Sequence, residues 1–190
     1  MKLSEFSKIA IPKIEAEMKV ILLSAKQNQD SSLYEMLTYH LGWSGEGVTS
    51  ISQGKRIRPL LLLLTNAVSG GDWEKSLPAA ATIELIHNFS LIHDDIEDAS
   101  QERRGRKTLW VRHSVPLALN AGDALFSISF MGLTRLGEFH SSKTTLDAIS
   151  LTATTCLKLT KGQHLDISFE NSTHVTVDRY IEMISGKTAA

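Results

Sequence analysis

The 190-residue sequence has little of several things that would point to particular classes of protein. Its single cysteine, Cys156, excludes an internal disulfide framework and a zinc site built from several cysteines. Its longest apolar run, residues 60–64, is far too short to span a bilayer. Residues 1–23 mix lysine and glutamate throughout, so they do not read as a signal peptide. We therefore expect a cytoplasmic protein without a transmembrane segment.

An excess of charge of either sign is also absent. The 20 Lys and Arg residues balance 21 Asp and Glu residues, and the net charge is -1. This balance gives no reason to expect a nucleic-acid binder held by bulk charge. Hydrophobic residues make up 42% of the chain, which is enough for a sizeable core. The length favours one domain spanning residues 1–190.

Strand signals are missing, apart from a weak alternation at residues 173–177. Glycine and proline are scarce, and the apolar residues recur at helical spacing instead. The helix predicted over residues 59–68 is apolar all round, so we expect it to be deeply buried. Residues 42–54 and 101–108 are expected to be loops. The sequence predicts an all-α fold whose helices cover residues 4–27, 32–41, 59–68, 74–98, 115–137, 143–170 and 178–190.

Three aspartates crowd the end of the helix predicted over residues 74–98. Asp94 and Asp98 are four residues apart, so their carboxylates project from one helix face, and Asp95 lies near the same end. Carboxylates at a helix C-terminus oppose the helix dipole and repel one another, which invites a cation. Oxygen ligands alone suit Mg²⁺. A solvent-exposed acidic helix end remains the alternative.

Basic residues follow these aspartates at once. Arg103 and Arg104 add guanidinium groups beside the carboxylates, as a metal–diphosphate site requires. Ion pairs between the two runs are the alternative for part of this cluster. Lys55 and Arg58 form a second basic group at a predicted helix N-terminus, where backbone N–H groups would converge on an anion.

Five further polar positions are weaker signals when each is taken alone. His87 lies before the aspartates on the same helix and could donate to a phosphate, although a histidine in an apolar stretch is more often a core residue. Gln163 and Asp166 share a helix face, and a hydrogen bond between helices would explain them equally well. The Lys187–Thr188 pair follows a glycine but lacks the upstream glycine of a P-loop.

Taken in order, these motifs resemble those of the all-trans polyprenyl diphosphate synthases, the prenyltransferases of the farnesyl and geranylgeranyl type. The strongest match is residues 84–108, which hold the aspartate-rich motif and the Arg-Arg-Gly that follows it. Residues 54–59, 120–123, 162–166 and 187–188 also fall in family order. The resemblance implies a largely antiparallel bundle of long helices around a central cavity, usually as a homodimer.

The resemblance also implies a reaction and its metal. Mg²⁺ held by aspartates draws diphosphate from an allylic substrate, and the allylic cation then alkylates isopentenyl diphosphate. The Mg²⁺ ligands would be Asp94 and Asp98, with Asp95 in support. The allylic diphosphate would be held by Arg103, Lys187 and Thr188.

By the same resemblance, four residues would hold isopentenyl diphosphate: Lys55, Arg58, His87 and Arg104. Gln163 and Asp166 would line the cavity near the reacting carbons. The cavity floor would be Phe89 and Ser90, one turn before the first aspartate. A bulky Phe89 should block long chains, which predicts a farnesyl or geranylgeranyl product. Replacing Phe89 with alanine should lengthen that product.

One departure from the family pattern concerns the metal site. The family carries a second aspartate-rich motif beyond the Lys-Thr pair, whereas this sequence has no Asp-Asp pair after Asp98. We therefore expect the N-terminal portion of a synthase, and weak diphosphate binding by that portion alone. Two alternatives stay open, a non-catalytic subunit of a larger synthase and a terpene cyclase. The second basic group argues against a cyclase, which binds one diphosphate.

Overall fold

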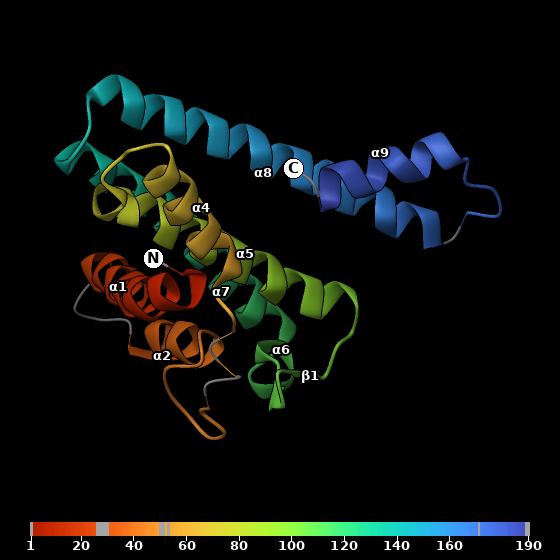
Figure 1. Ribbon diagram of the computed structural model, residues 1–190. Coiled ribbons are helices and arrows are strands. Elements are labelled where there is room, and N and C mark those ends of the chain that lie inside the picture. The colour runs from red at the N-terminus through yellow and green to blue at the C-terminus, as the bar shows by residue number, and fades with distance from the viewer. Residues whose placement is uncertain (1, 26–30, 50–51, 53, 171, 189–190) are drawn as a thin grey trace. The chain divides into compact units, whose positions relative to one another are not determined.

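The computed structural model describes residues 2–25, 31–49, 52, 54–170 and 172–188, and it is almost entirely helical (Figure 1). It contains two compact units, Met1–His140 and Ser141–Ala190, and each is described by itself. The all-α prediction is confirmed. The elements of the first unit are α1 (Leu3–Ala25), α2 (Ser31–His40), α4 (Ile57–Val68), η1 (Trp73–Ser76), α5 (Leu77–Glu97), β1 (Glu102–Arg103), β2 (Arg106–Lys107), α6 (Leu109–Arg112), α7 (Val115–Thr134) and η2 (Arg135–Glu138). The second unit consists of α8 (Ser142–Glu170) and α9 (Val177–Lys187).

Most helix limits agree with the sequence prediction to within a few residues. The largest difference is at residues 74–98, where a short 3₁₀ helix, η1, precedes α5. Pro78 stands in the first turn of α5, where its missing N–H does no harm, and so marks a new helix start. The predicted helix ends at residues 27 and 190 lie outside the described residues.

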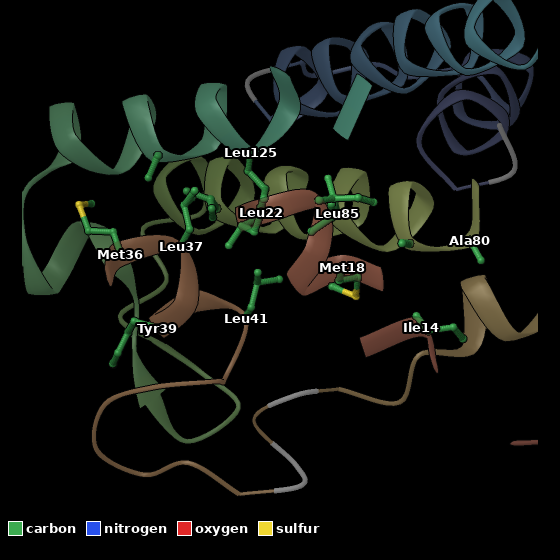
Figure 2. Close-up of a cluster of buried hydrophobic side chains, with 14 of the residues drawn as sticks. Ile14, Met18, Leu22, Met36, Leu37, Tyr39, Leu41, Ala80, Leu85 and Leu125 are labelled. Atoms are coloured by element: carbon green, nitrogen blue, oxygen red, sulfur yellow. The ribbon is translucent and has the colours of Figure 1, made fainter. Parts of the chain in front are cut away.

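The core of the first unit lies between α1, α2, α5 and α7 (Figure 2). One face of α1 is buried at helical spacing, with Ile14, Met18 and Leu22 facing inward. Leu37 of α2, Leu85 of α5 and Leu125 of α7 meet them there. Each such side chain contributes about 1.5–3 kcal/mol on full burial. The core therefore fixes α5, the helix that carries the aspartates.

The leucine-rich helix α4 is less buried than expected. Its buried residues are Pro59 and Leu63, whereas Leu61 is 55% exposed and Val68 is 80% exposed. The helix packs along one side against α5, so an apolar residue on its far side has no neighbour to cover it. The prediction of deep burial for the whole helix is wrong.

Helices α5 and α7 form a close antiparallel pair. The Thr82 hydroxyl donates to the Ser129 carbonyl at 3.1 Å near one end of the contact. At the other end a Cβ on Gly122 would lie 2.3 Å from Nε2 of His93, so any larger residue there would require the His93 ring to move. This register places the start of α7 beside the aspartate-rich end of α5.

The expected loop at residues 101–108 is a short antiparallel hairpin. Glu102 pairs with Lys107, and Arg103 pairs with Arg106. Between them, Arg104 and Gly105 have φ angles of 54° and 74°, and type I′ hairpin turns require positive φ at both central residues. The sequence prediction missed these two strands because each is only two residues long.

The second unit is a pair of helices that cross at two glycines. A Cβ on Gly162 would lie 2.2 Å from the backbone nitrogen of Lys187, and one on Gly186 would lie 2.9 Å from the Lys158 carbonyl. Lys161 and Glu182 pair across the helices at 2.7 Å. Residues 173–177, where the sequence shows a weak strand signal, run into the start of α9. There the Thr176 hydroxyl accepts a hydrogen bond from the Arg179 N–H.

Among the described residues, the stretch Val115–Glu138 is long and apolar enough to cross a membrane by length and composition. It comprises α7 and η2. In the structure Ala118, Ala121 and Leu125 of this stretch are buried within the first unit. A core helix passes the same test, so the match is weak evidence for a membrane span.

Candidate functional site

The three aspartates of α5 are divided between two faces. Asp98 is the C-cap of the helix, and its N–H donates to the Asp94 carbonyl at 2.8 Å. Asp94 is half-buried and Asp98 is exposed, one turn apart. Asp95 is buried, and its Oδ1 accepts from both Nε and Nη2 of Arg103 at 2.8 Å. Burial raises the pKa of Asp95, and the contact with Arg103 opposes that shift.

The predicted ion pair between the acidic and basic runs is therefore present at Asp95 and Arg103. Asp94 and Asp98 remain as the pair of carboxylates that shares one helix turn. Within the described ranges, no group of three or more His, Cys, Asp or Glu side chains is arranged to hold a metal ion. Mg²⁺ typically takes one or two carboxylates and completes its shell with water and phosphate oxygens. This donor set fits an ion shared with a phosphate, and it does not form a closed cage.

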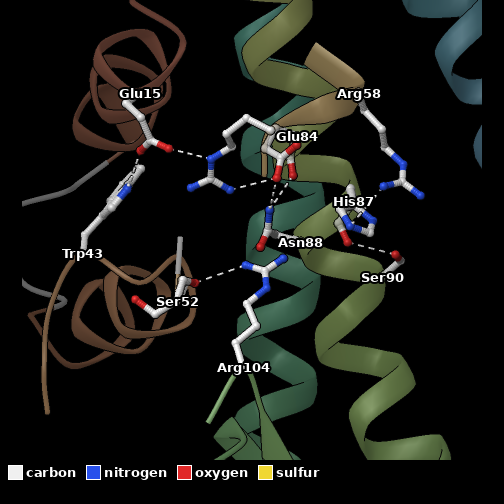
Figure 3. A network of polar contacts seen from close by, with 10 residues as sticks. Glu15, Trp43, Ser52, Arg58, Glu84, His87, Asn88, Ser90 and Arg104 are labelled. Carbon is white, nitrogen blue, oxygen red and sulfur yellow. Dashed lines mark hydrogen bonds and ion pairs between the residues drawn. The ribbon is translucent and has the colours of Figure 1, made fainter. Parts of the chain in front are cut away.

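Arg58 of α4 and Arg104 of the hairpin form a cationic cluster around His87 of α5 (Figure 3). Nη1 of Arg58 lies 3.4 Å from Nε2 of His87. A guanidinium can only donate, so this His87 nitrogen is the acceptor and the ring is neutral. Burial lowers the pKa of His87 to about 4, and the neighbouring Arg58, Arg104 and Arg103 lower it too. Positive charge is concentrated where these side chains meet.

Arg104 reaches this cluster from the hairpin turn. Its Nη1 donates to the Ser52 carbonyl at 3.1 Å. A Cβ on Gly54 would lie 2.8 Å from the Arg104 guanidinium carbon, so the glycine that opens the Gly-Lys-Arg-Ile-Arg-Pro string lets this side chain pass. Burial and the nearby Arg56 lower the pKa of Arg104, whereas Glu84 raises it. Lys55 is exposed, next to the start of α4.

A buried network of ion pairs and hydrogen bonds, which the sequence did not predict, supports the cluster. Arg56 is 1% exposed and forms ion pairs with Glu15 of α1 and Glu84 of α5. Asn88 donates to the Glu84 carbonyl at 2.8 Å, and Trp43 donates to Glu15 at 2.7 Å (Figure 3). Glu84 within an apolar helical run was the available signal, because a buried carboxylate needs a partner.

A second histidine, His40 of α2, lies close to this network. Burial lowers its pKa to about 3, and the positive charges of Arg104 and Arg103 act in the same direction. Its buried Nε2 has no hydrogen-bond partner among the described residues. A pocket lined by His40, Asp95, Arg103 and Arg104, among others, opens at this point.

Phe89 and Ser90, the residues predicted to form the cavity floor, lie on α5, and Phe89 contacts α7. The ring of Phe89 packs against Phe126 with centroids 4.7 Å apart, and against His93 at 5.7 Å. The Ser90 hydroxyl donates to the His87 carbonyl at 2.9 Å (Figure 3).

The other predicted site residues belong to the second unit. Asp166 of α8 forms an ion pair with Lys187 at the end of α9. Gln163 is half-buried on α8, and Thr188 is the exposed C-cap residue of α9. Within this unit the structure brings Lys187 and Asp166 together.

Comparisons with known proteins agree with this fold. The polyprenyl synthetase family model matches residues 46–190. A short chain isoprenyl diphosphate synthase of Methanocaldococcus jannaschii is 37% identical over 97% of this chain and 51% of its own length. A geranylgeranyl diphosphate synthase of Saccharolobus solfataricus is 40% identical over 82% of this chain and 44% of its own length.

A solved structure titled geranylgeranyl pyrophosphate synthetase, from Pyrococcus horikoshii, superposes with a TM-score of 0.82 at 32% identity. It covers 98% of this chain and 52% of that one. The chain belongs to the polyprenyl synthetase family. It spans about half the length of the curated relatives it matches.

Proposed function

We propose that the chain is the part of a short-chain trans-prenyl diphosphate synthase that binds isopentenyl diphosphate and the metal-linked end of an allylic diphosphate. The relatives named as farnesyl and geranylgeranyl diphosphate synthases support this reaction class. The observation that carries the proposal is the cationic cluster of Arg58 and Arg104 around the neutral His87, with Arg104 and Asp95 lining one pocket. A diphosphate would supply the negative charge that this cluster lacks.

Isopentenyl diphosphate would be held by Arg58 and Arg104 through N–H donors, with Lys55 adding a cation at the start of α4. The N-cap residue of α4 has φ 51° and makes no side-chain cap, which favours an anion near the first-turn amides. His87 is neutral in the absence of substrate, and because its Nε2 accepts from Arg58, its proton is on Nδ1. It would donate to a phosphate oxygen.

The allylic diphosphate would bind on the aspartate side. Asp94 and Asp98 would hold Mg²⁺, which when bound supplies positive charge to the departing diphosphate. Arg103 uses Nε and Nη2 for Asp95, which leaves Nη1 to donate to a phosphate oxygen. Asp95 would therefore position Arg103 and would not act as a metal ligand. Lys187 and Thr188 would add to this site, and Gln163 and Asp166 would line the cavity.

The two alternatives have less support. A terpene cyclase binds one diphosphate and does not explain a second cationic cluster on α4 and the hairpin. A non-catalytic subunit does not require Asp94 and Asp98 to share one helix turn near that cluster. We also propose a cytoplasmic location and a homodimer, as the family resemblance implies.

The proposed binding of substrate can be tested separately from catalysis. In buffer with Mg²⁺, isothermal titration calorimetry should detect isopentenyl diphosphate and inorganic diphosphate on the 190-residue chain. Arg104→Gln should weaken both by about tenfold or more, because a charged hydrogen bond is lost. Lys8→Gln, an exposed change on α1, should leave both affinities unchanged. Binding that is equal in wild type and Arg104→Gln would contradict the proposed site.

Catalysis is tested by supplying the allylic primers. Labelled isopentenyl diphosphate and Mg²⁺ are supplied with each allylic diphosphate in turn, and any product that forms should have farnesyl or geranylgeranyl length. Asp94→Asn should abolish elongation while leaving isopentenyl diphosphate binding within about twofold of wild type, because the two anion sites use different residues.

A further inference from the structure

Helix α1 carries a second apolar stripe, on the side away from the core (red in Figure 1). Its residues Ile9, Ala16, Val20 and Leu23 are exposed and lie within about 60° of one another, at about 100° per residue. Ile9, Val20 and Leu23 are 49%, 42% and 55% exposed. The buried face, which includes Met18, lies on the other side of the helix. A helix with one covered face normally has polar residues on its outer side, and this helix does not.

Lysines border the outer stripe on both sides. Lys8 and Lys19 are exposed and lie about 80–100° from Ile9 in one direction around the helix. Lys13 lies about 40° from Ile9 in the other direction. The apolar surface is therefore framed by ammonium groups along its length.

Acidic side chains offset part of this charge. Two of the three glutamates of α1, Glu15 and Glu17, are bound to arginines of the same unit. Four lysines and two glutamates remain around the stripe: Lys2, Lys8, Lys13, Lys19, the exposed Glu5, and Glu74, which pairs with Lys13. This face thus has a positive excess, although the whole chain has a net charge of -1.

Two tryptophans lie at the borders of the stripe, one on each side. Nζ of Lys19 is 5.5 Å from the centre of the Trp43 ring, and Nζ of Lys13 is 5.4 Å from the centre of the Trp73 ring. Both rings are partly exposed. Tryptophan is enriched where the apolar part of a membrane meets water, because its ring is apolar and its N–H is polar. Apolar residues framed by lysine and tryptophan are typical of a helix that lies in the membrane interface.

We propose that the outer face of α1 docks the molecule on an anionic lipid surface. Ile9, Val20 and Leu23 enter the boundary between headgroups and acyl chains, and Lys8 and Lys19 contact the headgroups. Anionic lipids attract lysines that come within a Debye length of the surface. The docking is peripheral, because the inner face of α1 stays in the protein core. This inference goes beyond the proposed function and does not depend on it.

The test measures how the 190-residue chain partitions onto lipid vesicles, by co-sedimentation. Vesicles of phosphatidylcholine alone are compared with vesicles in which about one third of the lipid is phosphatidylglycerol. Wild type should bind the anionic vesicles about tenfold more tightly than the neutral ones. Raising the salt concentration from about 0.1 M to about 1 M should remove most of this difference, because salt screens exposed charges.

Two double variants separate the apolar and the charged parts of the stripe. Val20→Gln with Leu23→Gln should weaken binding to anionic vesicles by about tenfold, because apolar surface no longer enters the lipid. Lys8→Gln with Lys19→Gln should weaken it by a similar factor while leaving binding to neutral vesicles unchanged. All four positions are exposed, and circular dichroism checks that both variants fold.

Matched controls change the same residue types elsewhere on the surface. Val68→Gln, at an 80% exposed position on α4, and Lys158→Gln, at an exposed position on α8, should leave vesicle binding unchanged. Binding of inorganic diphosphate should be the same in wild type and in both α1 variants, so the proposed function is tested separately.

Three results would overturn the inference. One is the absence of vesicle binding by wild type, and another is equal binding to neutral and anionic vesicles. The third is a double variant of Val20 and Leu23 that binds vesicles as wild type does but has a lower mass by light scattering. The stripe would then be covered by a second copy of the chain.

Discussion

At the scale of single residues, two arginines of the site are held in backbone conformations that L-residues rarely adopt. Arg56 has φ 51° and Arg104 has φ 54°. Each such residue costs of order 1 kcal/mol and persists when its surroundings fix it. Arg56 is fixed by Glu15 and Glu84, and Arg104 donates to the Ser52 carbonyl. These contacts fix the positions of the guanidinium groups in the absence of a bound anion.

The protonation of His87 should report on occupancy. Its pKa is lowered to about 4 by burial and by neighbouring arginines, so it is neutral at pH 7. Bound diphosphate offsets the arginine charges, so the pKa should rise by one unit or more, and binding should take up a proton at pH values near and between the free and the bound pKa. Nuclear magnetic resonance titration of labelled histidine, with and without inorganic diphosphate, measures this shift.

The exposed His174 provides the reference in the same spectra. Its ring resonances should be the same with and without diphosphate. A pKa of His87 that does not move while diphosphate is bound would place the anion elsewhere.

The other buried histidine should make the protein sensitive to mild acid. The pKa of His40 is lowered to about 3, so between pH 6.5 and 3 the unfolded chain binds a proton there that the folded chain does not. Stability must therefore fall as the pH falls through this window, by up to about 2 kcal/mol at pH 5. Urea unfolding at pH 7 and pH 5 should show a smaller loss for His40→Asn than for wild type. Equal losses would mean that His40 is protonated in the folded state.

At the scale of elements, the hairpin joins the basic residues to the segment before α4. The buried Arg106 donates to the carbonyls of Tyr39, Ser44 and Glu46 at 2.7, 2.6 and 2.9 Å. Its guanidinium also lies 3.9 Å from the centre of the Tyr39 ring. The strand that follows Arg104 is thereby anchored to residues near the end of α2. The anchor limits where the turn can place the Arg104 side chain.

Adding one methyl group at the crossing of α8 and α9 should destabilise this pair of helices. Gly162→Ala would place Cβ 2.2 Å from the Lys187 backbone nitrogen, and backbone cannot move aside as a flexible side chain can. Overpacking of about 1–3 kcal/mol should outweigh the gain in helix propensity of about 1 kcal/mol. Hydrogen exchange of residues 177–187 should become faster by about tenfold. Ser168→Ala, on an exposed face of α8, should leave it unchanged.

The parts of the site that sequence reasoning found are those fixed by local geometry. Asp94 and Asp98 share a turn because helical spacing places them there, and the possible pairing of the acidic and basic runs was foreseen. The network around Arg56 could not be foreseen, since its partners lie 41 and 28 residues away along the chain. The covered face of α4 was missed although Arg58 and Thr65 mark its exposed side, because the prediction started the helix at Pro59 and relied on the run of leucines. The metal, substrate and floor assignments stay predictions.

At the scale of the whole molecule, exposed apolar residues on α7 bear on assembly. Leu117, Leu119 and Met131 are 49%, 40% and 47% exposed. We expect a homodimer, so light scattering should give twice the chain mass of 21.0 kDa. Leu119→Glu should shift the mass toward the monomer, because charge at a buried interface is unfavourable. Val68→Glu, at an 80% exposed position on α4, is the control and should leave the mass unchanged. A monomeric wild type would contradict the expectation.

The cationic cluster has a consequence for how long the molecule survives. Like charges at Arg58, Arg104 and Arg103 repel one another while no anion is bound, and this lowers the free energy of unfolding. A ligand at one hundred times its dissociation constant adds about 2.7 kcal/mol. Resistance to a protease should therefore rise when diphosphate is added, and this gain should be smaller for Arg104→Gln. By the proposed function, an interruption in the supply of isoprenoid diphosphates in a cell would then shorten the lifetime of this protein.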